Sequence, residues 1–344
     1  MAGYGGFTGF VLLRARAHRL LLAAALLTVL LTTAVLATLT AYSGAVGDAA
    51  LRHALADPRN AADTALVVKA DVAEEGREEA DRTVREGARD TFGGLPVTVR
   101  TLPRSGAYSL PGTVRPRGER SDDPDLTYFA APDPAQVRVT EGRLPREGTA
   151  LKGGAVEVAL PAAAAERLDV RPGTRLTLAD RFDGPDVTVE VTGLYRPADA
   201  GDPYWRLDDL AGRGVKKGGF TTYGPLLAGP GVLGGGRVSA GPSGWLATAD
   251  FSSVTAGRTD GLREAARAGM AWLRERPALS GSTAATTSLP ETLDRLDRSL
   301  LVSRSTLLVV ALQLTLLAGC ALLLVARLLS AERAAERRLL RARG

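Results

Sequence analysis

Residues 305–326 read STLLVVALQLTLLAGCALLLVA, 22 residues without a formal charge between Arg304 and Arg327. At about 1.5 Å per helical residue the run is about 33 Å long, which matches a bilayer hydrocarbon core of about 30 Å. We therefore predict that 305–326 is a transmembrane helix. The chain on its two sides must then lie in different aqueous compartments, and this constrains the rest of the architecture.

The residues before this span, 288–304, are predicted to form a stalk helix continuous with it. Ser288 and Glu291 have the spacing of a capping box, and the proline between them fits the first turn, so the helix should begin here. Leucines recur along one face at helical spacing, namely Leu289, Leu293, Leu296 and Leu300. We expect the last three to pack against a helix that continues from the first span, around residues 46–55, because an isolated apolar stripe is unstable in water.

A second charge-free run, 20–47, predicts another transmembrane helix near the N-terminus. It is nearly twice as long as the apolar region of a typical secretory signal, which favours an uncleaved anchor over a cleaved signal peptide. In the leader, 1–19, the residues Phe7, Phe10 and Val11 share a helical face, so the leader is either a short interfacial helix or a disordered segment.

The charges beside the two spans predict the orientation of the chain. Three arginines precede the first span, and the tail, 327–344, holds six arginines against Glu332 and Glu336. Both termini are therefore expected in the cytoplasm, in a multi-pass protein of the cell membrane, with 48–287 as an extracytoplasmic domain. The region between the spans has 34 basic and 36 acidic residues, so the net charge of +5 belongs to the membrane-flanking ends. The high pI therefore does not indicate a nucleic-acid partner.

The apolar and polar residues of the outer region alternate in some segments and follow helical spacing in others, which predicts a mixed α+β domain. Strands are expected at 65–71 and 95–102 around a helix at 72–91, which makes a β-α-β unit. Segment 103–134 is rich in Pro, Gly and Asp and is expected to be a loop or a frayed insertion, and segment 198–244, rich in Gly and Pro, is expected to be mostly loop. Between them a series of short strands surrounds one small helix, and a further helix is expected at 259–276. The fold class is thus α+β, with two transmembrane helices flanking a large outer domain.

The sequence offers little material for catalysis. The chain has only two histidines, His18 and His53, both near the first span, and His53 is expected to be an exposed juxtamembrane residue. The one cysteine, Cys320, lies within the second span, so no disulfide is expected in the outer domain. No nucleophile elbow or phosphate loop is visible, and we predict no enzymatic activity, no cofactor and no metal.

Acid pairs and tryptophans are the remaining polar or aromatic candidates in the outer region. The pairs Asp122–Asp123 and Asp208–Asp209 could bind a cation or act in acid–base chemistry, but their Gly/Pro-rich surroundings favour solvated loop charges. The three tryptophans, Trp205, Trp245 and Trp272, could line a groove, although packing in the core or between subdomains is favoured.

Three stretches together resemble the first part of an FtsX-like (MacB-type) ABC transporter permease. The first is EGRLP at 141–145, followed by AVEVALPAAAAERLDVRPGTRLTL at 155–178 and VTVEVTGLY at 187–195. The second is the span that runs into the basic segment ending LLRARG, and the third is the N-terminal span with its leader. Family permeases carry at least two further spans after this point, so we expect a truncated or split gene product, or a partner that supplies the rest.

The resemblance implies an integral membrane subunit without catalytic residues, which couples a separate cytoplasmic ABC ATPase to movements of the outer domain. It also implies that the tail faces the ATPase through a short set of residues, namely Glu332, Glu336, Leu339, Leu340, Arg341 and Arg343. The charge of the tail alone favours the simpler interpretation, in which it only anchors the helix end at the cytoplasmic face of the membrane. Membrane lipid, the ATPase in trans and a second permease half or a continuation of the chain are the expected partners. A membrane-anchored sensor or a regulator of cell-wall enzymes without transport activity is the alternative.

Overall fold

The computed structural model describes residues 19–114, 124–146, 154–181, 184–279 and 283–342. The chain divides into two units, one made of residues 1–51 and 295–344 and the other of residues 52–294. We describe each unit by itself. The second unit extends seven residues past the predicted end of the outer domain at 287 and begins four residues after its predicted start at 48.

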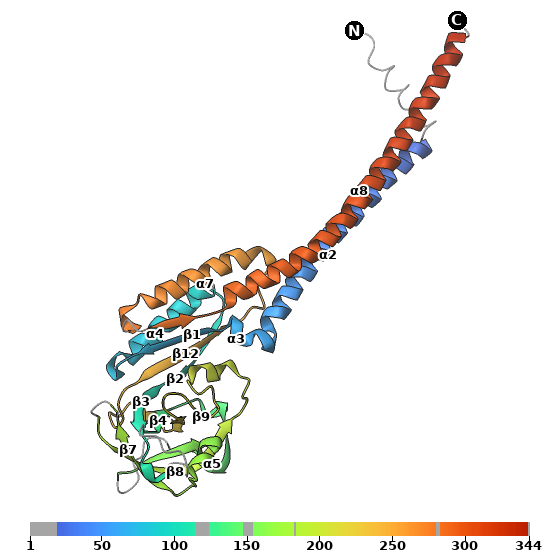
Figure 1. Cartoon of the computed structure of the whole chain (residues 1–344). Helices are drawn as coiled ribbons and strands as arrows, with labels where there is room; N and C mark the ends of the chain where they lie inside the picture. Colours follow the sequence, from blue (N-terminus) through green and yellow to red (C-terminus); the bar gives the residue numbers. More distant parts are fainter. Residues whose placement is uncertain (1–18, 115–123, 147–153, 182–183, 280–282, 343–344) are drawn as a thin grey trace. The chain divides into compact units, whose positions relative to one another are not determined.

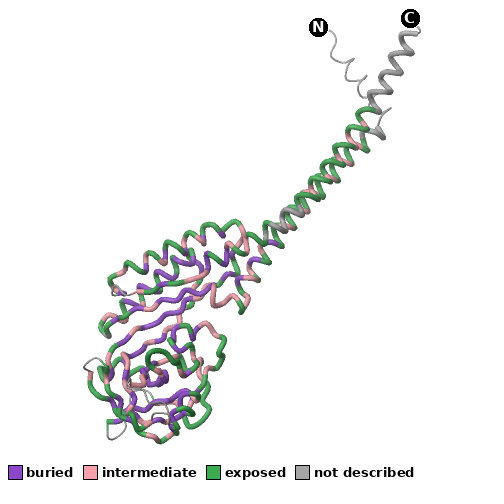
Figure 2. Tube along the Cα trace, in the orientation of Figure 1, coloured by how far each residue is buried: buried purple, intermediate pink, exposed green. Residues whose placement is uncertain are grey.

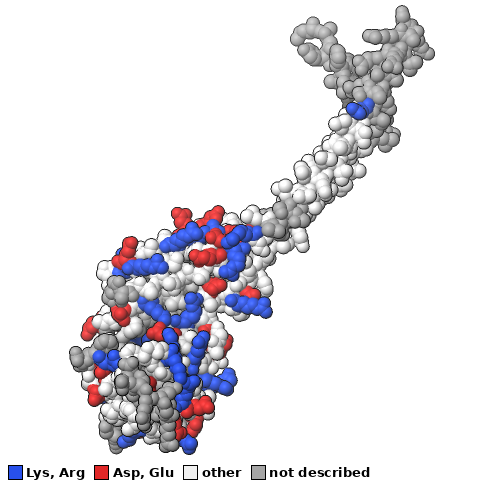
Figure 3. Space-filling model, in the orientation of Figure 1, with Lys and Arg blue, Asp and Glu red and all other residues white. Residues whose placement is uncertain are grey.

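The first unit contains most of two long helices, α2 (Arg19–Ala56) and α8 (Leu289–Ala342). Both include a stretch that is long and apolar enough to cross a membrane, 23–56 in α2 and Leu308–Arg327 in α8. The most apolar part of each stretch has no buried residue, whereas Leu51 and Leu55 near the end of α2 are buried. Large side chains such as Leu26, Leu316 and Leu324 are more than 60% exposed. Most of the described length of both stretches carries no charged side chain (Figure 3). Exposed apolar surface of this extent is expected in lipid and is unstable in water.

The second unit has two lobes, which we name by their sheets. The sheet lobe, residues 52–102 and 242–294, holds a four-stranded sheet in the order β13-β1-β12-β2. The central strand β12 is antiparallel to both β1 and β2. Its elements are α3 (Ala61–Thr64), β1 (Leu66–Asp71), α4 (Arg77–Thr91), β2 (Val97–Leu102), β12 (Pro242–Ala249), α7 (Thr259–Arg274) and β13 (Ala284–Thr286).

Helices α4 and α7 lie together over one face of this sheet (Figure 1). They approach closely at two glycines. A Cβ atom on Gly269 would lie 2.7 Å from the Cα of Thr91, and one on Gly87 would lie 2.5 Å from the Cδ2 of Leu273. The face of α7 buried there includes Leu262, Ala266 and Leu273, which follows the helical spacing of the sequence (Figure 2).

The barrel lobe, residues 103–241, contains a nine-stranded sheet. Strand β11 pairs with both β6 and β4, so six strands in the order β11-β6-β8-β7-β3-β4 form a closed ring around an apolar core. The elements are β3 (Arg104–Ser109), β4 (Leu126–Ala130), β5 (Val137–Gly142), β6 (Val156–Pro161), α5 (Ala162–Leu168), β7 (Arg175–Asp180), β8 (Val187–Pro197), β9 (Val215–Lys216), β10 (Thr222–Tyr223), β11 (Leu226–Leu227) and α6 (Pro230–Leu233).

The motif EGRLP, 141–145, lies at the end of β5, where the chain passes close to β8. Gly142 has φ +69°, and a Cβ there would lie 2.8 Å from the Cα of Gly193 on β8. Glycine is therefore required for both backbone conformation and space. The next residue, Arg143, turns to β6 and forms two hydrogen bonds with Glu157, of 2.7 and 2.5 Å.

Several sequence predictions are confirmed by these elements. Strand 65–71, helix 72–91, strand 95–102 and helix 259–276 are present with small shifts at their ends, and α8 begins at Leu289 as expected. The β-α-β unit is a split one, because β12 lies between its two parallel strands.

Of the two segments expected to be loop, one prediction is wrong and one is confirmed. Segment 103–134 contains the ring strands β3 and β4. Segment 198–244 is mostly irregular, although it also contains three short strands, two short helices and the start of β12. Strand β12 has a glycine, Gly244, where a Cβ would lie 3.2 Å from the side chain of Leu207. Glycine and proline here allow close packing and chain crossing, which composition alone cannot distinguish from a loop.

Candidate functional site

The barrel lobe is inserted between β2 and β12, so two crossing segments join it to the sheet lobe. These segments pair with each other: Ser105 forms an antiparallel bridge with Ala240, and the amide of Gly106 donates to the carbonyl of Ser239 at 3.0 Å. Tyr108, buried in the barrel core, also accepts a hydrogen bond from the Ser239 amide at 2.9 Å. The junction is therefore a hydrogen-bonded pair of strands and not two free linkers.

Apolar side chains from both lobes pack at this junction. The 3₁₀ helix η5 (Pro203–Leu207) of the barrel lobe lies against the sheet, with Tyr204, Trp205 and Leu207 at most 2% exposed. They belong to one core cluster with Val67, Leu102 and Leu246 of the sheet lobe. An interface with a continuous buried core resists relative motion of the lobes, because opening it would expose these side chains to water.

Ion pairs and hydrogen bonds surround this apolar contact. Arg100 on β2 forms two hydrogen bonds with Asp202, of 2.8 and 2.9 Å, and Tyr204 donates to the carbonyl of Thr101 at 2.9 Å. Burial of Asp202 opposes its ionisation, but the hydrogen bonds from Arg100 and from the Tyr204 amide outweigh it, so the pKa of Asp202 is lowered. The carboxylate is thus held in its charged form against β2.

A second polar cluster lies next to this interface and includes the acid pair Asp208–Asp209. Asp209 binds Lys69 of β1 at 2.9 Å and Arg104 of β3 at 2.7 Å, so it connects the two lobes. Arg104 is 7% exposed, and its guanidinium lies 4.3 Å from the ring centre of Tyr128. Burial favours the protonated form of Asp209, but these two cations outweigh it, and the pKa is lowered.

The neighbouring carboxylate is in a different state. Asp208 is 2% exposed and accepts hydrogen bonds from the Tyr128 hydroxyl and from the amide of Gly212, the latter at 2.8 Å. Burial raises the pKa of Asp208 despite these donors, and burial together with the charge of Asp208 raises the pKa of Tyr128. The expectation that both acids are solvated loop charges is thus wrong for Asp208, and Asp209 forms ion pairs at the junction. Asp122 and Asp123 lie outside the described residues.

A pocket of about 250 Å³ opens beside this cluster, lined by Arg104, Thr127, Asp209, Lys216 and Phe220 among others. Among the residues that the structure describes, no group of three or more His, Cys, Asp or Glu side chains could hold a metal ion. The side chains at the junction are therefore arranged to hold the lobes together by paired charges. The sequence does not single out Arg104 and Tyr128, because they lie in a segment expected to be loop. The aromatic and β-branched residues of LTYFA at 126–130 are nevertheless typical of a buried strand.

The predicted coupling residues lie along α8. Leu289 and Leu293 are fully buried in the second unit, as is Leu55 at the end of α2, whereas Leu296 is half-buried in the first unit. The Leu300 side chain lies outside the described residues. The predicted ATPase-facing residues Glu332, Glu336, Leu339, Leu340 and Arg341 fall in α8 with side chains that are not described, and Arg343 lies outside the described residues altogether.

The structure shows how far the three tryptophans and His53 are buried. Trp205 and Trp245 are buried, as favoured for packing residues, and the Trp245 indole donates to Asp81 at 3.2 Å. Trp272 is half-buried, with the guanidinium of Arg276 3.7 Å from its ring centre. His53 is exposed, as expected.

Comparison with known proteins adds no relative to this description. The chain matches no protein-family model, and no curated protein matches it significantly.

Proposed function

We propose that this chain is a non-enzymatic membrane subunit of an ABC transporter of the FtsX/MacB type, which couples a separate cytoplasmic ATPase to movements of its outer domain. The observation that carries the proposal is α8. This one helix begins among buried residues of the domain, with Leu289 and Leu293 fully buried and Thr292 1% exposed, and also contains the candidate span Leu308–Arg327. Motion of the span along or about its axis would be passed to the residues packed around the start of the helix.

The domain itself supports this proposal, because its lobes are held together. The buried core at η5, the Arg100–Asp202 pair and the contacts of Asp209 with Lys69 and Arg104 would make the barrel lobe follow the sheet lobe. A domain of this kind transmits displacement instead of absorbing it. The proposal places membrane lipid around α2 and α8, the ATPase at the basic tail, and a second permease half or a continuation of the chain beside the spans. It involves no cofactor and no nucleic acid.

The proposed topology places both termini in the cytoplasm of a multi-pass cell-membrane protein and residues 52–294 outside. It can be tested by labelling, because Cys320 is the only native cysteine. In a Cys320→Ser background, Ser253→Cys adds a thiol at an exposed position of the domain, and Gly344→Cys adds one to the tail. A membrane-impermeant maleimide should label the first in intact cells and the second only after lysis.

The unsubstituted Cys320→Ser chain serves as the control for background labelling. Labelling of Gly344→Cys in intact cells, or protection of Ser253→Cys until lysis, would contradict the proposed orientation. If the orientation is as proposed but no ATPase accompanies the chain, the alternative of an anchored sensor or a regulator of cell-wall enzymes would be favoured.

A further inference from the structure

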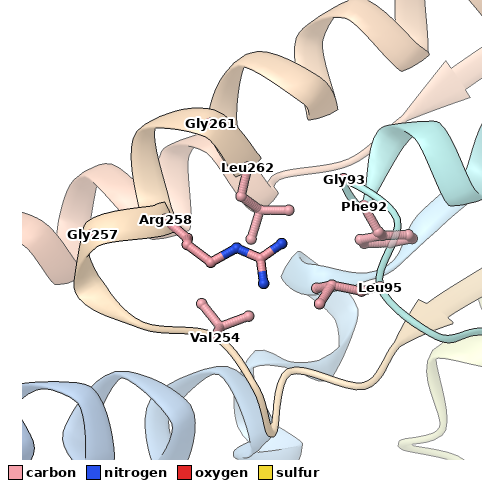
Figure 4. Close-up of a pocket in the computed structure, with 8 residues that line it drawn as sticks. All are labelled: Phe92, Gly93, Leu95, Val254, Gly257, Arg258, Gly261 and Leu262. Carbon is pink, nitrogen blue, oxygen red and sulfur yellow. The ribbon is translucent and has the colours of Figure 1, made fainter.

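A pocket of about 370 Å³ lies in the sheet lobe at the point where α4 ends and α7 begins. The turn after α4, the loop after β12 and the first turn of α7 form its walls (Figure 4). Eight residues line it, namely Phe92, Gly93, Leu95, Val254, Gly257, Arg258, Gly261 and Leu262. None of these residues takes part in the junction between the lobes or in the α8 contacts described above.

The floor of this pocket is apolar and already fixed by the domain core. Phe92 is fully buried, Val254 is 2% exposed, and Leu95 and Leu262 are each 6% exposed. Phe92 also packs edge-on against Phe251, with 6.1 Å between ring centres. Glycine at 261 leaves the wall open, because no atom lies within 4 Å of the position its Cβ would take. The pocket is therefore preformed, with a volume in the range of small-molecule sites.

One charged group enters this apolar space. The guanidinium of Arg258 projects into the pocket, between the side chains of Leu262, Val254 and Leu95 (Figure 4). No hydrogen bond or ion pair of this guanidinium is found among the described residues. Arg263, one turn further along α7, instead binds Asp260 and also Asp294, the latter at 2.7 Å. The neighbouring acids are thus turned to Arg263, and Arg258 remains the cation of the pocket.

We propose that this pocket binds a small monocarboxylate with an apolar body. The guanidinium presents two parallel N–H donors that match a carboxylate, and the floor of Phe92, Val254 and Leu262 receives an aliphatic or aromatic group. The one cation that lines the pocket, Arg258, matches a single negative charge better than it matches a dianion such as phosphate. The proposal is independent of the transporter function, because it uses only contacts within the sheet lobe.

The test is calorimetric titration of the full chain in nanodiscs of zwitterionic lipid. Cyclohexanecarboxylate serves as the probe, cyclohexylmethanol as the uncharged analogue with the same body, and acetate as the head group alone. Titration into empty nanodiscs measures partition into lipid. We expect saturable binding of cyclohexanecarboxylate in the millimolar range or tighter, at least tenfold weaker binding of cyclohexylmethanol, and no saturable binding of acetate.

Two variants connect this binding to the pocket. Arg258→Met should weaken binding of the carboxylate at least tenfold while leaving the weak binding of the alcohol unchanged, and Gly261→Val should weaken both by filling the space. Arg138→Met is the matched control, since Arg138 is an exposed arginine on β5, remote from the pocket, and should bind as the parent chain does. Equal affinity for carboxylate and alcohol, full binding by the Arg258 variant, or no saturable binding of the probe would overturn the proposal.

Discussion

Replacement of Arg143 by Met should destabilise the barrel lobe in a manner that depends on pH. The Glu157 side chain is 2% exposed and accepts two hydrogen bonds from Arg143 and one from the Arg146 amide at 3.0 Å. The hydrogen bonds from Arg143 are the main reason that the pKa of Glu157 falls from 4.5 to about 2, against the opposing effect of its burial. Arg143→Met leaves this carboxylate with one backbone donor.

The expected magnitude follows from that pKa. A lowering of about 2.5 corresponds to about 3.4 kcal/mol of stability. We reduce this to about 2 kcal/mol because the Arg143 side chain is 44% exposed and water screens the pair. For a unit of this size the melting temperature should fall by about 4–8 °C at pH 7.

The sign of the pH dependence is fixed by the direction of the pKa. Because the folded pKa of Glu157 is below the unfolded one, the stabilisation is complete above about pH 4.5 and is lost as the pH falls towards 2. The difference between Arg143→Met and the parent should therefore shrink over that range. Urea unfolding of residues 52–294, followed by tryptophan fluorescence from pH 7 to 3, measures it. The control Arg138→Met should match the parent, and an equal loss for Arg143→Met at pH 7 and pH 3, or no loss at all, would refute the reasoning.

Two further stability predictions follow from close contacts. Gly269→Ala should destabilise the domain by about 1–3 kcal/mol, because α4 and α7 must separate at Thr91 to make room for the new methyl group. In the matched helix variant Gly261→Ala the methyl group meets no atom, so this variant should be neutral or stabilising by up to about 1 kcal/mol. Thermal melts that rank the two variants the other way would exclude the helix contact. Leu207→Ala should lower the free energy of unfolding by about 2–5 kcal/mol, because its side chain fills the core between the lobes. The midpoint of unfolding should fall for both lobes together. Limited proteolysis that releases an intact barrel lobe from this variant, without loss of its strands, would show that the lobes are independently stable.

The sequence predicts the helices and strands that have a regular apolar pattern. It does not predict strand β12, which lacks such a pattern. Helix α7 and strand β8 have clear periodicity, because one face of each packs on the core and the other is more exposed to water. Strand β1 is buried along most of its length and is predicted by its apolar, β-branched residues. Strand β12 begins with Pro242 and contains Gly244, and it lies at the centre of its sheet. Glycine at 244 leaves room for Leu207 of η5, which is distant in sequence, so a local pattern cannot predict this strand.

The candidate site at the lobe junction is harder to predict for the same reason. Asp208 and Asp209 are adjacent in sequence, yet one is buried with a raised pKa and the other pairs with cations from β1 and β3. Burial raises the pKa of Asp208, whereas Arg104 and Lys69, each more than 75 positions away, lower that of Asp209. The sequence alone does not show these tertiary contacts, so it predicts the same environment for both acids, namely a solvated loop.

The proposed passage of motion through α8, between an ATPase and the domain, can be measured as ATP hydrolysis. The chain is purified from its own membranes through a tag after Gly344, reconstituted with the ATPase it carries, and assayed alongside Leu296→Pro and the control Leu296→Ala. Proline within α8 removes a backbone hydrogen bond and costs about 3 kcal/mol or more, whereas alanine keeps the helix intact.

We expect vanadate-sensitive hydrolysis in the parent and in Leu296→Ala, and at least a tenfold loss in Leu296→Pro, with the same amount of ATPase bound in all three. Full hydrolysis with the proline in place, or no ATPase bound to the parent chain, would contradict it.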